Sequence, residues 1–438
     1  MIAVRVSAAF LALAVGGAHA GEISLRESPA PAARIVLTTR LNGELIVAQG
    51  GKPTSLKLEA LAEHRYRERA IGTSQAGGLP ARAIRYYDDA RAAISIDSTT
   101  SPRTLRPDRR LIAVERRDTS AISFSPGGAL TREELELVGE HFDSLALTSV
   151  LPDKSMAIGG TWPIPESTAA VLCGLERLAE HDLTAKLAEA NASVAVIAVN
   201  GSAKGTTLGA RATVKVNGMI RFDLKSQRIV AAEWKQTDAR DQGPASPAVN
   251  AEIVVTLTRE ACEPGVDLAD VALPPLTDGS AIPESLTAIT IPDIKGRYSL
   301  TCSRDWLLTS RSESNMVLRL LEDGEFVAQA TITPWQKAAP GQRDDPRSFR
   351  DAMLKSPGWT AEQLLEESEL PARPDGRRVI RAVARGQMQS TAVLQAFYLI
   401  TDARGDQIVV AVTAKLSQAE KLAGRDAALV DGIAFPKP

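Results

Sequence analysis

Apolar and polar residues alternate along most of the first 260 residues, with a period of two that is typical of half-buried β-strands. The stretch RIVLTTRLNGELIVA begins at Arg34 and places Asn42-Gly43 between two apolar runs, which predicts a tight β-hairpin. Further alternating runs follow in SLKLEALAEHRYRER, RAIRYYDDARAAISI, RRLIAVERR and AISFS. Runs between residues 192 and 259 predict more strands, with Asn217-Gly218 as another tight turn.

Two segments predict helices instead. Thr131 and Glu134 have the spacing of a capping box. The apolar stripe that follows consists of Leu135, Val138, Phe142 and Leu145. A second helix is predicted over residues 167–190, with a break near His181-Asp182. The predicted first domain, residues 34–263, is therefore α+β, with a large antiparallel curved sheet and a few helices.

Residues 264–294 are rich in proline and weakly periodic, so they predict an interdomain linker. A last domain, residues 295–438, alternates again. Its predicted strands are YSLTCS, NMVLRLL, FVAQATITPW, EESEL, RVIRAVARG, LQAFYLITD and DQIVVAVTAKL. Helices are predicted in PRSFRDAMLKS and, at the end, in SQAEKLAGRDAALVDGI. Asp323-Gly324 predicts a tight hairpin between the second and third strands.

The order of these elements resembles the PsbP-like family of domains, which includes the bacterial DcrB and LpqN groups. The resemblance lies in YSLTCSRDW (Tyr298–Trp306), the hairpin at Asp323-Gly324, the helix after Trp335, the hairpin FYLITDARGDQIVV and the last helix before GIAF. Asp305 stands where these families usually have proline. The resemblance covers about a third of the chain. It implies an α/β sandwich, an antiparallel sheet flanked by helices, in domains that bind or assist more often than they catalyse.

The first domain is similar to the LolA-like class of envelope proteins. The similarity lies in LPDKSMAIGGTWPIP (Leu151–Pro165) and in the uninterrupted strands from Val194 to Leu257. It implies a curved sheet that wraps around a few helices, and a role with lipids.

The first 20 residues have the pattern of a secretory signal peptide. Arg5 provides the charged start, an apolar run extends from Val6 to Val15, and Ala18-His19-Ala20 fits the cleavage pattern. That run is shorter than a membrane-spanning helix needs, and no later segment approaches the required length. We therefore expect export to the periplasm or the extracellular space, with cleavage near Ala20. The mature chain would begin with a polar leader, residues 21–33, and contain no transmembrane segment.

Charge and cysteine content limit the classes of partner. The formal net charge is −2, and loss of Arg5 makes it −3, whereas nucleic-acid binding needs a basic surface. Cys173, Cys262 and Cys302 lack the spacing of a metal site. Buried thiols are the favoured interpretation, and a disulfide between Cys173 and Cys262 stays open for an oxidising compartment.

No pattern predicts a catalytic set. Gly72-Thr73-Ser74-Gln75-Ala76 comes nearest to a nucleophile elbow, but Ala76 replaces the second glycine and the surrounding stretch predicts a loop. Glu140, His141 and Asp143 lie within one helical turn, where a solvated helix face is favoured over a metal site. The sequence therefore predicts neither a metal ion nor a cofactor.

Arginines gather in two places. The first set consists of Arg103, Arg106, Arg109, Arg110, Arg116 and Arg117. Arginine forks suit anions, but a charged strand edge is the favoured interpretation here. The second set, Arg377, Arg381 and Arg385, shares one face of a predicted strand. Arg404-Gly405-Asp406 predicts a hairpin turn rather than an adhesion site.

Four residues are the candidate ligand-binding groups: Trp335, Trp162, Arg381 and Arg385. Trp335 follows Pro334 at a predicted strand end. Core anchoring is the default role of such a tryptophan, and the lining of an apolar groove stays open as the alternative. We expect an exported protein without enzymatic activity that binds a lipid, another apolar ligand or a partner protein in the cell envelope. Two alternatives stay open, a hydrolase with an active site assembled from loops and an assembly factor that acts through sheet-edge pairing.

Overall fold

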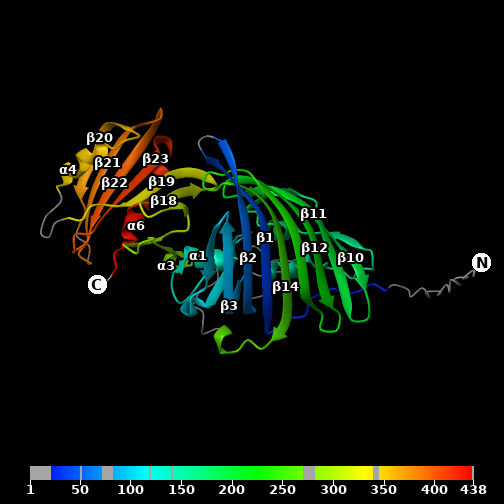
Figure 1. The fold of residues 1–438 in the computed structure, drawn as a ribbon. Coiled ribbons are helices and arrows are strands. Elements are labelled where there is room, and N and C mark those ends of the chain that lie inside the picture. The colour runs from blue at the N-terminus through cyan, green and yellow to red at the C-terminus, as the bar shows by residue number, and fades with distance from the viewer. Residues whose placement is uncertain are drawn as a thin grey trace, which may run out of the picture.

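The computed structural model describes residues 21–49, 52–71, 82–117, 120–139, 142–269, 282–338, 345–371, 373 and 375–436. Within these ranges the chain forms two large sheets and one small sheet, together with short helices (Figure 1). Nearly all of the strands pair antiparallel, and the protein is α+β, as the sequence predicts. The predicted signal peptide lies outside the described residues.

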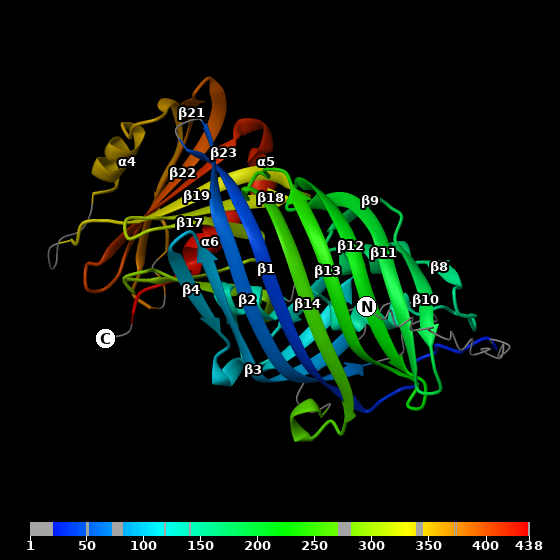
Figure 2. The same ribbon diagram turned by 45° about the vertical axis from the view of Figure 1, so that its right-hand side comes forward.

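The largest sheet contains thirteen of the described strands in the order β6-β5-β3-β2-β1-β14-β13-β12-β11-β10-β8, with β4 paired to β3 and β9 paired to β11. Their bounds are β1 Ala32–Gln49, β2 Lys52–Ile71, β3 Arg82–Ile96, β4 Thr99–Thr104, β5 Leu111–Arg117, β6 Ser120–Phe124, β8 Thr161–Pro163, β9 Arg177–His181, β10 Thr184–Ala190, β11 Val194–Thr207, β12 Ala210–Asp223, β13 Arg228–Arg240 and β14 Ala248–Cys262. Figure 2 shows the long strands of this sheet side by side, seen from its convex side.

Three short helices lie on the concave side of the large sheet. They are α1 (Arg132–Val138), the 3-10 helix η2 (Ser144–Val150) and α2 (Glu166–Leu172). Thr131 and Glu134 form the predicted capping box at the start of α1. Only part of the predicted apolar stripe lies in this helix, because α1 ends at Val138. Phe142 is nevertheless buried, and its ring lies 5.5 Å from that of Trp234 on β13. The helices thus pack against the inward face of the curved sheet and form the main hydrophobic core with it.

Two predicted hairpin turns are wrong. Asn42-Gly43 lies within β1 and Asn217-Gly218 lies within β12, and both strands continue without a break. Each glycine serves close packing instead, which is a common role of glycine inside a strand. A Cβ on Gly43 would lie 2.2 Å from the carbonyl oxygen of Asn250, and a Cβ on Gly218 would lie 2.6 Å from the ring of Trp234.

The predicted long helix over residues 167–190 is also wrong beyond its first turns. Only α2 is helical there, and β9 and β10 follow it. Gly174, with φ of 65°, follows the end of α2 and supplies a left-handed conformation that breaks a helix. Leu183, Ala185 and Leu187 then alternate inward from β10 and the residue before it, so a period of two replaces the helical one.

The other two sheets contain most of the last third of the chain. The small sheet consists of β24 (Ile433–Ala434), β16 (Ser299–Cys302), β15 (Ile289–Pro292) and β7 (Leu130–Thr131), in that order. The seven-stranded sheet has the order β17-β18-β19-β23-β22-β21-β20. Its strands are β17 Trp306–Arg311, β18 Met316–Glu322, β19 Glu325–Pro334, β20 Thr360–Glu369, β21 Arg378–Met388, β22 Thr391–Thr401 and β23 Gln407–Lys415. The helices are α3 Glu284–Thr287, α4 Pro346–Leu354, α5 Ala419–Leu422 and α6 Arg425–Asp431.

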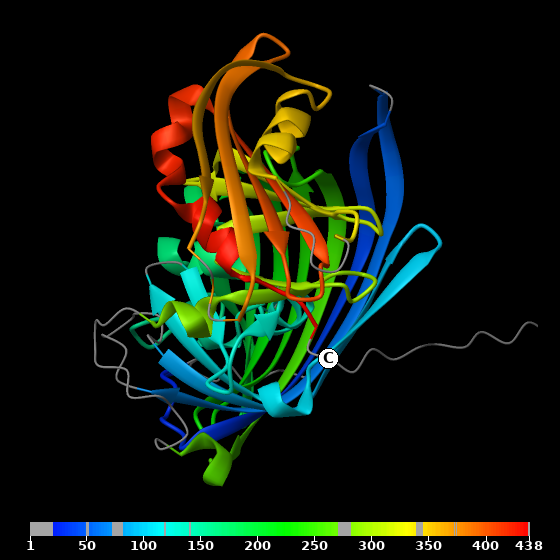
Figure 3. The same ribbon diagram turned by 90° about the vertical axis from the view of Figure 1, so that its left-hand side faces the viewer.

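Helices cover both faces of the seven-stranded sheet, as Figure 3 shows. On one face Phe349 of α4 packs on Phe397 and Leu399. On the other face Leu422 of α5 and Leu429 of α6 pack in a separate core. The single closing helix that the sequence predicts is divided into α5 and α6, because Ala423 and Gly424 between them are left-handed.

The large sheet and the last third of the chain are joined at several places. β7 pairs parallel with β15 through Leu130 and Ile289, in the segment that the sequence predicts as a linker. Glu133 on α1 forms a 2.8 Å ion pair with Arg311 on β17. Asp323, at the confirmed turn between β18 and β19, lies 2.8 Å from Arg177. The domain boundaries at residues 263 and 295 stay a prediction.

Candidate functional site

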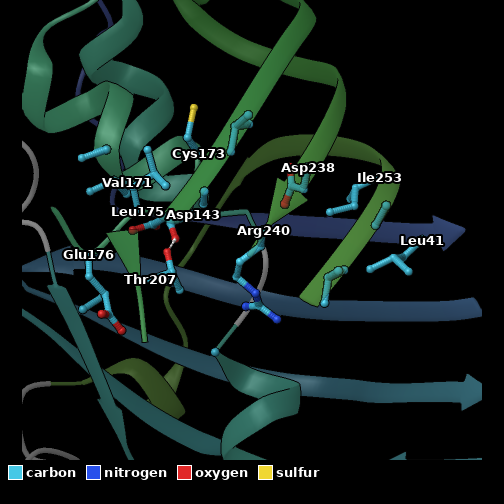
Figure 4. A pocket seen from close by; sticks show the side chains of 18 of the residues that line it. Leu41, Asp143, Val171, Cys173, Leu175, Glu176, Thr207, Asp238, Arg240 and Ile253 are labelled. Atoms are coloured by element: carbon cyan, nitrogen blue, oxygen red, sulfur yellow. Dashed lines mark hydrogen bonds between the residues drawn. The ribbon is translucent and has the colours of Figure 1, made fainter. Parts of the chain in front are cut away.

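A cavity of about 660 Å³ opens on the concave face of the large sheet (Figure 4). Its aliphatic lining comes from five strands and from the helical segments opposite them. These residues are Leu41, Leu45, Leu58, Val114, Val138, Val171, Leu175, Val214, Val249 and Ile253. The volume lies within the range of about 300–1,000 Å³ that is usual for small-molecule sites.

The lengths of the elements explain why this space is left open. A seven-residue helix such as α1 or α2 is about 10 Å long, whereas the 18 residues of β1 extend for about 60 Å. The helices therefore cover only part of the inward face. Ile35 and Leu37 are completely buried beneath them, while Leu41, on the same face of β1, is only partly buried and borders the cavity.

A buried polar network lies at one side of the cavity. The Arg85 guanidinium donates from Nε to Glu68 at 2.8 Å, and the hydroxyl of Ser144 donates to the same carboxylate at 3.0 Å. Asp143 lies 3.5 Å from Arg85 and also pairs with Arg116. Of these residues Arg85, Arg116 and Asp143 line the cavity, so this side of the wall is charged but internally compensated.

Arg116 has donors that this network does not use. Its side chain is 5% exposed, and Nη2 donates to Asp143. The other guanidinium nitrogens, Nε and Nη1, are covered and have no hydrogen-bond partner. A buried donor without an acceptor typically costs about 1–3 kcal/mol, so these two nitrogens mark an incomplete site.

A second charged group lies at the end of β13 and just before β9. Arg240 extends into the open space in Figure 4, near Asp238 and Glu176. Burial lowers the pKa of Arg240 by more than the attraction of Asp238 and Glu176 raises it. Its Nε has no hydrogen-bond partner, and within the described ranges Arg240 makes no ion pair. The two carboxylates have partners, since Glu176 accepts from the backbone of Leu208 and Asp238 accepts from Gln236.

Cys173 also lines the cavity, beside α2. Burial, and then the negative charge of Asp238, raise the pKa of the Cys173 thiol to about 12. Such a thiol is protonated near neutral pH and is a poor nucleophile. The three cysteines are free thiols, and Cys262 is only partly buried, so the structure contains no Cys173–Cys262 disulfide.

A smaller cavity of about 150 Å³ lies beside the main one and shares Leu41 with it. Its lining is mostly aliphatic but includes His64, which is 3% exposed and bonded through Nε2 to the carbonyl oxygen of Leu137 at 2.9 Å. Nδ1 of the same ring has no partner. The concave face therefore offers apolar space on both sides of Leu41.

The four predicted ligand-binding residues are not brought together. Trp162 lies on β8 and donates from Nε1 to the carbonyl oxygen of Val150 at 2.8 Å. Trp335 follows β19 and is 41% exposed. Arg381 pairs with Glu366 on β20, and Arg385 is exposed on the same strand as Arg381. None of the four lines the main cavity, and their role in binding stays a prediction.

The other sequence candidates have structural roles or lie outside the described residues. Arg404-Gly405-Asp406 forms the predicted turn, with φ of 81° at Gly405. Asp143 caps η2 and pairs with Arg116, while Glu140, His141 and the stretch 72–76 fall outside the described ranges. Across the described part of the chain, no three histidine, cysteine, aspartate or glutamate side chains are grouped to hold a metal ion.

Sequence reasoning missed Arg240, Asp238 and Glu176. One signal was present in the sequence. β13 ends with EWKQTDAR, and the residues on one face of this strand change from Trp234 and Gln236 to the charged Asp238 and Arg240. Polar groups thus continue a face that begins in the core. The signal could be interpreted only with knowledge of which face of the strand is concave.

Comparisons with known proteins show no family for this chain. No protein-family model matches it, and no curated protein matches it significantly. Among solved structures, cyanobacterial PsbP from Synechocystis sp. PCC 6803 is 12% identical with a TM-score of 0.28, over 36% of this chain and 98% of that one. The Ran-binding protein Mog1p from Saccharomyces cerevisiae is 11% identical with a TM-score of 0.26, over 34% of this chain and 95% of that one.

A structure described as showing lipid–protein interactions in lipovitellin is 10% identical with a TM-score of 0.30, over 54% of this chain and 26% of that one. These likenesses concern the fold alone, and the resemblance to the PsbP-like fold is weak. Among the described helices, none is long and apolar enough to span a membrane.

Proposed function

We propose that this protein binds an apolar ligand in the cavity of the large sheet, as an exported carrier or binding protein of the cell envelope. The supporting observation is the cavity itself, which continues the inward aliphatic face of β1 and β14 beyond the end of the helices. Transfer of apolar surface from water into such a space contributes about 25 cal/mol per Å². A single acyl chain that fills the aliphatic part therefore gains favourable free energy from burial alone.

The first test is mass spectrometry of an organic extract from the gently purified full chain, expressed with export in a native-like envelope. We expect an apolar molecule in stoichiometric amount. The second test is binding of Nile red, a neutral fluorescent probe, to protein from which ligands have been extracted. Saturable binding at one site per chain supports the proposal, whereas an empty extract together with no saturable binding would refute it.

A pair of substitutions connects binding to the cavity. Leu41→Trp places a large ring in the main cavity, so Nile red affinity should fall by at least about tenfold. Leu61→Trp is the matched control, because Leu61 lies on the neighbouring strand opposite Arg40 and is 41% exposed on the convex face. Equal affinities in the two variants would place the binding site elsewhere.

A further inference from the structure

The unused polar groups of the cavity wall are hydrogen-bond donors. They are Nε and Nη1 of Arg116 and Nε of Arg240, each without a partner. Each carboxylate in the same wall already has at least one partner. Asp143 pairs with Arg116, and Glu176 and Asp238 each accept a hydrogen bond, at 2.9 Å and 2.8 Å. A ligand that completes this site therefore has to bring acceptors.

The formal charges of the residues that line the cavity balance one another. Three arginines, Arg85, Arg116 and Arg240, face three carboxylates, Asp143, Glu176 and Asp238. Glu68 lies behind Arg85 and adds one more negative charge. An anionic head group would increase this negative excess inside a partly desolvated space, where an uncompensated charge is costly. A neutral acceptor fills the same hydrogen bonds without that cost.

We propose that the ligand is a neutral fatty-acyl ester, with its chain along the aliphatic lining and its carbonyl oxygen accepting hydrogen bonds from Arg240. This inference rests on the proposed carrier function and specifies its ligand class. An ester offers acceptors and no donor, whereas an alcohol or a primary amide brings donors as well. Arg240 makes the first contact because its side chain extends into the cavity.

The inference is tested by displacement of Nile red from the full chain with three ligands of equal chain length. Methyl myristate carries a neutral ester, myristate at pH 8 carries an anion, and tetradecane carries no head group. A hydrogen bond from a charged donor is commonly strong enough for a tenfold difference in affinity. We expect the ester to bind at least about tenfold more tightly than tetradecane, and more tightly than the anion.

Substitutions at Arg240 test whether this side chain is responsible for the preference for the ester over the alkane. Arg240→Met removes the donors and should bring ester and alkane to within about twofold of each other. Arg240→Gln keeps N–H donors without the charge and should preserve part of the preference. Arg221→Met is the control, since Arg221 is exposed on the convex face of β12 and should leave the preference unchanged.

The outcomes separate the two proposals. Saturable Nile red binding with equal displacement by ester and alkane, or with tighter binding of myristate, overturns the ester inference and leaves the carrier function standing. An ester preference that survives Arg240→Met overturns the role of Arg240. Absence of any saturable Nile red binding overturns the carrier function and the ester inference together.

Discussion

Arg85→Met is expected to destabilise the protein strongly, because it removes the cation from the buried network beside the cavity. Arg85 and Glu68 are each 4% exposed, and 2.8 Å separates Nε from the carboxylate oxygen. After the substitution, Glu68 keeps the hydrogen bond from Ser144 but loses its countercharge. Removal of one partner from a buried ion pair typically costs about 3–5 kcal/mol, because the remaining charge is left in a poorly solvated place.

The assay is urea unfolding of the full chain, followed by near-UV circular dichroism and tryptophan fluorescence. With an m-value of about 3 kcal/mol per M, the expected loss lowers the urea midpoint by about 1 M or more. The double variant Glu68→Gln/Arg85→Met removes both charges, so it should be more stable than Arg85→Met alone. The losses measured for Glu68→Gln alone and for Arg85→Met alone should therefore not add up in the double variant.

The same pair of strands provides the control. Arg91 on β3 pairs with Glu63 on β2 at 2.6 Å, but these side chains are 58% and 41% exposed. Arg91→Met should leave the urea midpoint unchanged within error, because solvent screens an exposed pair. The reasoning fails if Arg85→Met and Arg91→Met shift the midpoint equally, or if the double variant is as unstable as the sum of its parts.

Three further changes test other features. Gly43→Val should lower the melting temperature, because a Cβ there would lie 2.2 Å from the carbonyl oxygen of Asn250; an unchanged melting temperature would count against this packing. Burial acts to raise the pKa of Glu134, but hydrogen bonds from Arg106 and from backbone N–H groups outweigh it and lower that pKa below 4.5. This stabilisation is complete above pH 4.5 and is lost as the pH falls through the lowered pKa. The free energy of unfolding of Glu134→Gln should therefore change less with pH in the acid range than that of the unsubstituted protein. Equal changes with pH in the two proteins would contradict this. Maleimide labelling of the native protein should modify Cys262 first, because burial raises the pKa of both other thiols to about 12; mass spectrometry showing another order would refute this.

Local sequence signals predicted the structure correctly at the places where interactions between neighbouring residues determine it. The capping box of Thr131 and Glu134 depends on residues three positions apart, and it forms as expected. The turn at Asp323-Gly324 also forms, because both residues are left-handed and the flanking strands pair directly. Asn42-Gly43 has the same local signature but lies in a strand, because β2 and β14 pair with it from both sides. β14 is distant in the sequence, and even the partner of Asn42 on β2, Glu59, lies outside the window of a few residues that a turn signal uses.

The cavity was beyond the reach of sequence reasoning for a related reason. Its wall combines residues that are far apart in the sequence, such as Leu41 and Ile253, which pair with each other across β1 and β14. Alternation along one strand shows that two faces differ, but it does not show where helices stop covering one of them. The alternation that puts Arg240 on the same face as Trp234 therefore cannot be interpreted as a site from the sequence alone, and the unused donors of Arg240 become evident only in the folded chain.

The strand order of the large sheet has a consequence for how the protein folds. Strands β1–β6 form one half of the described sheet and strands β8–β14 form the other, and the two halves pair only where β1 meets β14. Each half contains mainly pairings between strands that are near in the sequence, whereas this junction pairs Ala32 with Cys262. Because long-range contacts are slow to form, we expect β1 and β14 to pair after the strands within each half have paired. Until then both junction strands expose an open edge that other chains can pair with. Because the cavity is lined from both halves, the protein becomes able to bind a ligand in the same step that removes its main risk of aggregation.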